Sequence, residues 1–102
     1  MSGMNAARVT VRFEKPSFFL PGSGLTVSLN SQLVFQGDFT DGFEVTLEVA
    51  PGTHAINTRI DLGITRTRSA QVPVEAGRHT LINLEYSRFW GNFTKKPKVF
   101  VE

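Results

Sequence analysis

Apolar and polar residues alternate with a period of two along most of this chain. The segment 43–49 reads Phe-Glu-Val-Thr-Leu-Glu-Val, and the segments 9–14 and 25–29 alternate in the same way. This pattern is typical of a strand with one buried face, because successive side chains point to opposite sides of a strand. No stretch repeats apolar positions at helical spacing, so we expect no long helix.

Turn residues divide the alternating segments into seven to eight short strands. Asn30-Ser31 predicts a tight turn, Gly37–Gly42 a loop, and Pro51-Gly52 a further turn. The expected strands are 9–14, 25–29, 32–36, 43–49, 53–62, 64–74, 78–86 and a short one at 99–101. Short strands with turn signals about every 8–12 residues predict an all-β, single-domain antiparallel β-sandwich. It spans 1–102, with 1–8 flexible and 88–102 a C-terminal segment ending in the short strand.

The inward positions of these strands define a predicted core. It consists of Val9, Val11, Phe13, Leu25, Val27, Leu29, Phe43, Val45, Leu47, Val49, Ile56, Ile60, Val72, Val74, Leu81 and Leu84. The apolar run 17–20 lies between Pro16 and Pro21. Because proline cannot pair within a central strand, we expect this run at an edge or as a cap over the core.

Composition excludes several kinds of chemistry. The chain has 102 residues, 40% of them hydrophobic and 20% charged, and no Cys, so it has no disulfide, thiol nucleophile or Cys-ligated zinc. No apolar run is long enough to span a membrane, and the N-terminus lacks the apolar region of a signal peptide. On these grounds a cytoplasmic location is favoured, and no cofactor is expected.

The two histidines, His54 and His79, are the only side chains that could act as bases at neutral pH. Each follows a Gly turn at the start of a strand, outside any nucleophile motif. His54 shares the parity of Ile56 and Ile60, so we expect a histidine at the rim of the core that bonds a turn carbonyl. Catalysis is therefore not expected.

Carboxylates also give no catalytic or metal site. Glu44 and Glu48 share one strand face but are separated by about 13 Å, which is too far for a glycosidase pair. The histidines and aspartates lack metal-ligand spacing. Asp38 and Asp41 are expected to shape their loop by accepting hydrogen bonds from backbone N–H groups.

Charge is unevenly distributed. No Lys or Arg lies between Pro16 and Thr58, where the net charge is −4, whereas residues 59–98 carry +5. If Leu62-Gly63 is a two-residue turn, Arg59 faces Arg66, which requires either an anionic partner or nearby acids. Pairing of strands 43–49 and 53–62 would bring Glu44 to Arg59, and this salt-bridged face is the favoured interpretation.

The segment 88–98 concentrates three aromatic residues and four cations. Such a mixture can bind nucleic acid by stacking and phosphate contacts, rest on an anionic membrane, or stack on a sugar. Alternatively, Phe89, Trp90 and Phe93 close one end of the sandwich, while Val99–Val101 pairs with the sheet and holds them there. The candidate binding residues are Arg66, Arg68, Arg88, Trp90, Lys95, Lys96 and Lys98.

The stretch 25–84 resembles the PEGA-like family of small β-sandwich modules. The resemblance is carried by the segments 27–34, Gln36-Gly37, 43–49, Pro51-Gly52-Thr53-His54-Ala55-Ile56 and Val72-Pro73-Val74-Glu75-Ala76-Gly77. Asn30-Ser31 replaces the Asp-Gly of the family, and the Gly37–Gly42 loop lacks its Thr-Pro. The resemblance implies a non-catalytic bacterial module at the cell envelope and supplies no catalytic residue.

Together these observations predict a non-catalytic interaction module. It would bind another protein, or itself, through sheet edges and loops, because the edges of a sandwich invite strand pairing. The alternative is a module that uses the aromatic and basic C-terminal segment to bind an anionic or carbohydrate polymer, a membrane surface or nucleic acid.

Overall fold

The computed structural model describes residues 6–14, 24–61, 64–87 and 92–102. Within these ranges the chain forms strands and one 3-10 turn. The strands are β1 (Ala7–Phe13), β2 (Gly24–Leu29), β3 (Gln32–Asp38), β4 (Phe43–Val49), β5 (Gly52–Asp61), β6 (Thr65–Val74), β7 (His79–Leu84), β8 (Tyr86–Ser87), β9 (Asn92–Phe93) and β10 (Lys98–Val101). The 3-10 turn, η2, is Phe39–Asp41.

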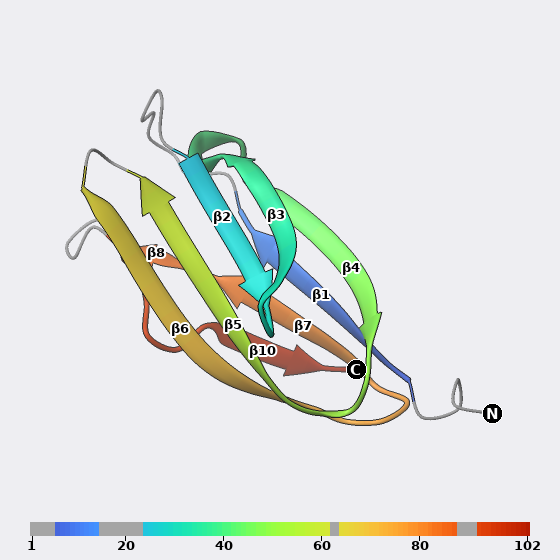
Figure 1. Cartoon of the computed structure of the whole chain (residues 1–102). Coiled ribbons are helices and arrows are strands. Elements are labelled where there is room, and N and C mark those ends of the chain that lie inside the picture. The colour runs from blue at the N-terminus through green and yellow to red at the C-terminus, as the bar shows by residue number, and fades with distance from the viewer. Residues whose placement is uncertain (1–5, 15–23, 62–63, 88–91) are drawn as a thin grey trace.

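Two four-stranded sheets pack face to face, which confirms the all-β sandwich (Figure 1). The first sheet has the order β10-β7-β1-β4 and the second β3-β2-β5-β6, and β8 pairs with β9 in a small ladder. All of these pairs are antiparallel except β1 with β7, which is parallel. The parallel pair departs from the fully antiparallel sandwich that the turn pattern predicted, because β1 and β7 are joined through the other sheet and not by a hairpin.

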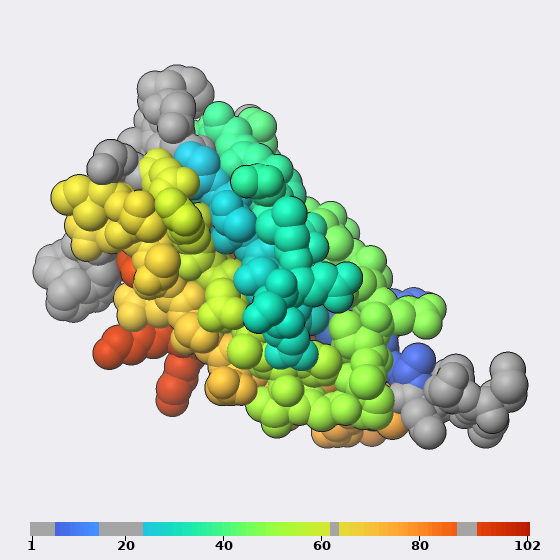
Figure 2. Space-filling model, viewed as in Figure 1, coloured from blue at the N-terminus to red at the C-terminus, as the bar shows by residue number. Residues whose placement is uncertain are grey.

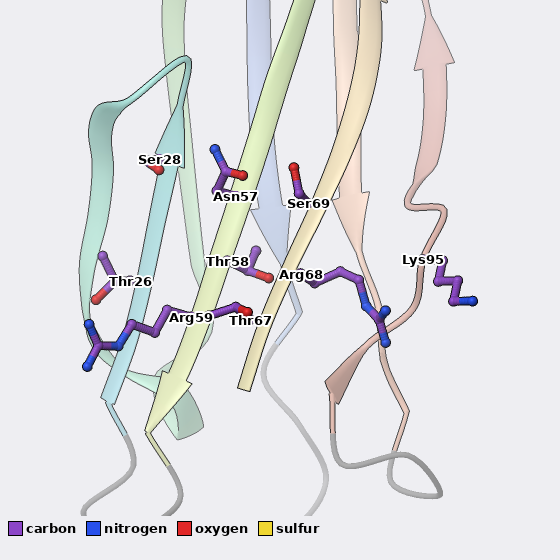
Figure 3. A pocket seen from close by; sticks show the side chains of 9 residues that line it. All are labelled: Thr26, Ser28, Asn57, Thr58, Arg59, Thr67, Arg68, Ser69 and Lys95. Carbon is purple, nitrogen blue, oxygen red and sulfur yellow. The ribbon is translucent and has the colours of Figure 1, made fainter. Parts of the chain in front are cut away.

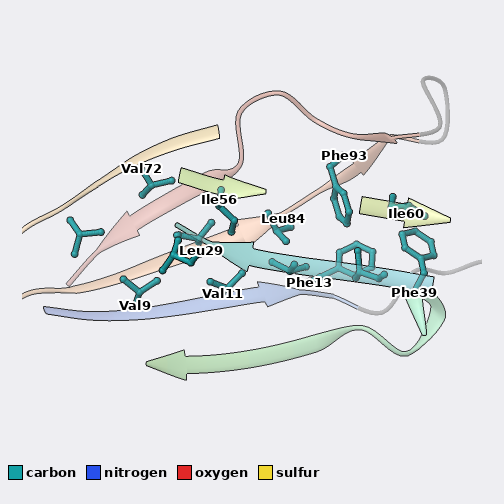
Figure 4. Packing of buried hydrophobic residues seen from close by; sticks show 14 of the residues in the cluster. Val9, Val11, Phe13, Leu29, Phe39, Ile56, Ile60, Val72, Leu84 and Phe93 are labelled. Atoms are coloured by element: carbon teal, nitrogen blue, oxygen red, sulfur yellow. The ribbon is translucent and has the colours of Figure 1, made fainter. Parts of the chain in front are cut away.

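The core lies between the two sheets (Figure 4). Its buried apolar residues are Ala7, Val9, Val11, Phe13, Leu25, Val27, Leu29, Phe39, Ile56, Ile60, Val72, Val74, Ile82, Leu84 and Phe93. The side chains come from alternate positions of β1, β2, β5, β6 and β7, as the period of two predicts. Burying each large member contributes roughly 1.5–3 kcal/mol relative to leaving it in water.

Two groups of predicted core residues differ from the prediction in burial. Leu81 is half-buried on the outer face of β7, and Ile82 occupies the core with no exposed surface. Leu81 and Leu84 are three positions apart, so they cannot share one face of a strand. The inward residues of β4 (Phe43–Val49) are half-buried, because β4 is the edge of its sheet, and Phe43, Leu47 and Val49 pack against the core as predicted.

The connections agree with the turn residues where the turns are tight. Asn30 and Ser31 have positive φ values of 50° and 69°, as a two-residue hairpin turn of type I′ requires. Gly37 is needed because a Cβ there would lie 2.7 Å from the ring of Phe35. That ring in turn stacks on Phe43, with centroids 4.4 Å apart.

The connection from β4 to β5 crosses between the sheets. The two strands do not pair, so the expected register of Val49 opposite His54 is wrong. Glu44 lies opposite Arg12 of β1, with an N–O distance of 3.8 Å, and does not approach Arg59. A Pro-Gly turn is compatible with either a hairpin or a crossing, which is why the sequence did not distinguish them.

The predicted meeting of arginines across the β5–β6 hairpin is also wrong. Arg59 lies opposite Thr67, and Arg66 lies opposite Ile60. The connection is one residue longer than a two-residue turn, since the register pairs Asp61 with Thr65. This shift moves the arginines to opposite faces of the sheet, because a one-residue change inverts side-chain direction.

Aromatic rings close one end of the sandwich. The ring of Phe13 lies 5.1 Å from those of Phe39 and Phe93, and Phe39 lies 4.8 Å from Tyr86. Phe93 is buried as predicted, with 2% of its surface exposed. Phe39 belongs to η2 in the stretch that we interpreted as a polar loop, so the sequence analysis missed it.

The C-terminal tail pairs with the first sheet, as predicted. β10 lies antiparallel to β7, with Phe100 opposite Leu81. At the other end of the chain, Ala7 and Arg8 belong to β1 and not to a flexible segment. The predictions for 17–20, Phe89, Arg88 and Trp90 lie outside the described residues.

Candidate interaction surfaces

β10 presents an apolar edge of the first sheet to solvent. Val99, Phe100 and Val101 are 39%, 52% and 49% exposed. Pairing with Ile82 directs Val99 toward the inner face, and pairing with Leu81 directs Phe100 toward the outer face. In Figure 2 red side chains of the segment 92–102 protrude past β6, to the left of the place where Figure 1 draws β10. Exposed apolar residues therefore occupy both faces of this edge.

The hydrogen bonds at the end of β10 establish which backbone groups face outward. Glu102 N donates to His79 O at 2.9 Å, and His79 N donates to Glu102 O at 3.4 Å. Hydrogen-bonded and non-hydrogen-bonded pairs alternate along an antiparallel ladder. The amides of Phe100 and Lys98 therefore face β7, and those of Val99 and Val101 point away from the sheet.

Contacts cover parts of the other sheet edges. On the opposite side of the sandwich, the Phe35–Phe43 stack bridges the β3 and β4 edges. One end of β6 is covered by β9, because Arg68 Nε donates to Phe93 O at 3.0 Å and Asn92 Nδ2 donates to Thr67 O at 3.0 Å. Among the described edge strands, β10 is therefore the one that carries the most exposed large apolar residues.

The structure brings together two of the predicted basic site residues. Arg68 and Lys95 both line a groove on the second sheet and a smaller pocket beside Phe93 and Thr94. Lys95 is exposed and makes no ion pair with the described residues. Arg68 and Lys95 therefore form a small positively charged cluster beside β6.

The remaining basic candidates are separate. Lys98 pairs with Glu85 at 3.3 Å, and Lys96 is exposed and lines neither groove. Arg66 is exposed near the start of β6. The predicted site therefore does not form a single patch from its described members.

The larger groove crosses the outer face of the second sheet (Figure 3). Its lining, apart from Lys95, is Thr26, Ser28, Asn57, Thr58, Arg59, Thr67, Arg68 and Ser69. Sequence reasoning missed these hydroxyl and amide residues, because it looked for charged and aromatic motifs. The signal in the sequence was the presence of Thr, Ser and Asn at the outward positions of β2, β5 and β6. Thr58 is the exception, because it shares the inward parity of Ile56 and Ile60.

His54 has the structural role that its position predicted. Its Nε2 donates to the carbonyl of Ala50 at 2.6 Å, so its Nδ1 is an acceptor and receives a hydrogen bond from Asn30 Nδ2. Asn30 Oδ1 accepts from Ala55 N at 2.7 Å. The buried imidazole thus ties the β2–β3 turn to the start of β5.

His79 lies on the outer face of the first sheet, so it does not cluster with His54. Its Nδ1 is 3.4 Å from a Glu102 carboxylate oxygen, and its Nε2 is 2.7 Å from Thr10 Oγ1, which also bonds Thr46 at 2.7 Å. The order hydroxyl, imidazole, carboxylate is that of a hydrolytic triad. However, Thr10 is only 4% exposed, and the chain of bonds instead connects β4, β1, β7 and the residue after β10.

Asp38 shapes its loop as predicted. Its carboxylate accepts from the Thr40 hydroxyl at 2.6 Å and from the Thr40 amide at 2.8 Å. These bonds stabilise the charged form and hold the pKa of Asp38 below its ordinary value of 3.8. Within the described residues, no three His, Asp or Glu side chains gather as a metal site.

No described helix is long and apolar enough to cross a membrane. The class that the fold defines is an all-β sandwich. No family model matches the chain, and no curated protein matches it.

Among solved structures, the chain is similar to one described as a "putative cell adhesion protein" from Bacteroides ovatus. The TM-score is 0.50 at 7% sequence identity. The match covers 96% of this chain but 44% of that chain, so this chain spans less than half of its length. At this identity the likeness concerns the fold alone.

Proposed function

We propose that this chain is a non-catalytic interaction module that binds another protein, or a second copy of itself, through the edge of β10. The observation that carries the proposal is the exposure of Val99, Phe100 and Val101 on a strand with one edge unpaired among the described residues. Unpaired N–H and C=O groups beside apolar side chains are what strand addition uses for affinity and specificity.

Two further observations support an interaction role over catalysis. Both histidines are engaged in hydrogen bonds that connect strands. The solved structure of similar fold is described in terms of cell adhesion. The resemblance of 25–84 to PEGA-like modules supports the same class of function and a bacterial cell-envelope setting.

The test of self-association uses Val101→Pro. Proline at 101 removes a donor from the free edge and leaves the β7 ladder intact, since the amide of Val101 points away from β7. Sedimentation equilibrium at protein concentrations up to about 1 mM detects dimers with a binding free energy of about −4 kcal/mol or stronger. We expect dimers of the wild type and monomers of the variant. Hydrogen exchange at the Val99 amide should slow with concentration, while that of Phe100 stays slow throughout.

A photoreactive residue at position 100 tests the edge against other proteins. Cross-links in extracts of the native cell are expected at 100 and not at the matched exposed position Gln71 on the second sheet. A wild-type chain that remains monomeric at about 1 mM and forms no cross-link from position 100 would contradict the proposal.

A further inference from the structure

The outer face of the second sheet carries two rows of short polar side chains across three strands. Register places Ser28 beside Asn57, and Asn57 beside Ser69. The second row consists of Thr26, Arg59 and Thr67, paired in the same way. Neighbouring strands are about 4.8 Å apart, so each row spans about 10 Å. We call this surface, together with Arg68 and Lys95 at its β6 edge, the sheet groove.

The polar groups of the sheet groove are largely unused by the fold. Within the described part of the chain, the side chains of Ser28, Asn57 and Ser69 make no hydrogen bond. Ser28, Asn57 and Ser69 lie at outward positions of their strands, so their polar groups are available to a ligand or to water.

The charges in the sheet groove favour an anion. Arg68 pairs with Thr58, so it starts from the inner side of the sheet. Its side chain extends beyond the β6 edge, on the side where Lys95 lies, whereas Arg59 crosses the outer face nearer β2 (Figure 3). No described Asp or Glu belongs to the lining, although Asp61 pairs with Arg59 at 3.3 Å from just outside it. Arg68 uses its Nε for Phe93 O, and its terminal nitrogens bond no other residue in the described part of the chain.

The lining also discriminates between classes of polymer. No aromatic ring lines the groove among the described residues, whereas single-stranded nucleic acid is generally held by base stacking on aromatic side chains. Hydroxyl and amide groups suit a ligand that itself carries many hydroxyls, because each can both donate and accept. The combination of such groups with three cations matches a sugar polymer that bears carboxylates.

We propose that the sheet groove binds an acidic polysaccharide. Arg68 and Lys95 hold a carboxylate of the polymer, and Ser28, Asn57 and Ser69 hydrogen-bond its hydroxyls. This site is separate from the β10 edge, so it goes beyond the interaction role proposed above and does not depend on it.

The test measures binding of fluorescently labelled oligogalacturonate by anisotropy. Lys95→Ala should weaken binding about two- to fivefold, the range of a solvent-exposed ion pair, and Lys96→Ala should change it by less than about twofold. The two lysines are adjacent and both exposed. Unequal effects of the two substitutions would therefore distinguish binding at a specific site from non-specific electrostatic attraction of the anionic polymer. Asn57→Ala should weaken binding roughly three- to tenfold through lost hydrogen bonds.

The ligand itself provides the second control. Carboxyl-reduced oligosaccharide should bind more weakly, and Val101→Pro should bind oligogalacturonate as the wild type does. The proposal is overturned if Lys95→Ala and Lys96→Ala have equal effects, if oligothymidylate binds more tightly than the glycan, or if nothing binds at about 1 mM. Thermal melts of each variant confirm that the fold is intact.

Discussion

At the scale of residues, aromatic rings do much of the packing at one end of the sandwich. Phe13 is in a strand whose alternation made it predictable, whereas Phe39 is in a 3-10 turn and Phe93 is in a two-residue strand. All three are buried and in ring contact. Aromatic pairs of this kind add about 0.5–1.5 kcal/mol beyond their buried area.

Phe93→Ala should therefore destabilise the domain by about 3–5 kcal/mol, because it leaves a cavity beside two other rings. Denaturant unfolding of the purified protein measures the loss. Phe100→Ala is the matched control, since Phe100 is half exposed and its truncation should cost about 0.5 kcal/mol or less in the monomer. Equal losses in the two variants would show that Phe93 is not part of the core.

Asp38 predicts a pH dependence. Its pKa in the folded state lies below the ordinary 3.8 because of the Thr40 hydrogen bonds. A lowered carboxyl pKa stabilises the fold fully above the ordinary pKa, and this contribution is lost as the pH falls through the folded value. Asp38→Asn should lower the Tm at pH 7, and the gap from wild type should close below about pH 4. A gap independent of pH would contradict this interpretation.

At the scale of elements, β10 shows what alternation can and cannot predict. The pattern Val99-Phe100-Val101 predicted a strand that joins the sheet, and β10 pairs with β7. It did not predict that the apolar residues remain exposed, since exposure depends on whether a further strand follows at the edge. The same limit applies to β4, whose predicted core residues are half-buried.

The two hydrogen-bonding edges of β10 predict different losses of stability when proline is introduced. Phe100→Pro removes a donor that faces β7 and should cost about 1 kcal/mol or more, lowering the Tm by roughly 4–8 °C. Val101→Pro should lower the Tm by less than half as much, because its amide faces away from β7. Thermal melts at low protein concentration compare the variants. A larger decrease in Tm for Val101→Pro than for Phe100→Pro would show that the amide of Val101, and not that of Phe100, bonds β7.

At the scale of the whole molecule, the sequence was sufficient for the fold class and not for the topology. Strand alternation and turn residues predicted the sandwich, the tight turn at Asn30-Ser31 and most of the core. Which strands pair across sheets could not be predicted, because Pro51-Gly52 permits both a hairpin and a crossing. The sheet groove was missed for the same reason, since Ser28, Asn57 and Ser69 become neighbours only through the pairing of β2, β5 and β6.

The parallel pairing of β1 with β7 has a consequence for how the chain matures during synthesis. β1 is synthesised before β7 and lies between β4 and β7 in the finished sheet, so one of its edges stays unpaired until residues 79–84 have been translated. Contacts between such distant segments form slowly, because a long loop must close first. A nascent chain therefore exposes one edge of an apolar strand until β7 has been made, and such an edge is a natural substrate for chaperones that shield it until the later partner is available.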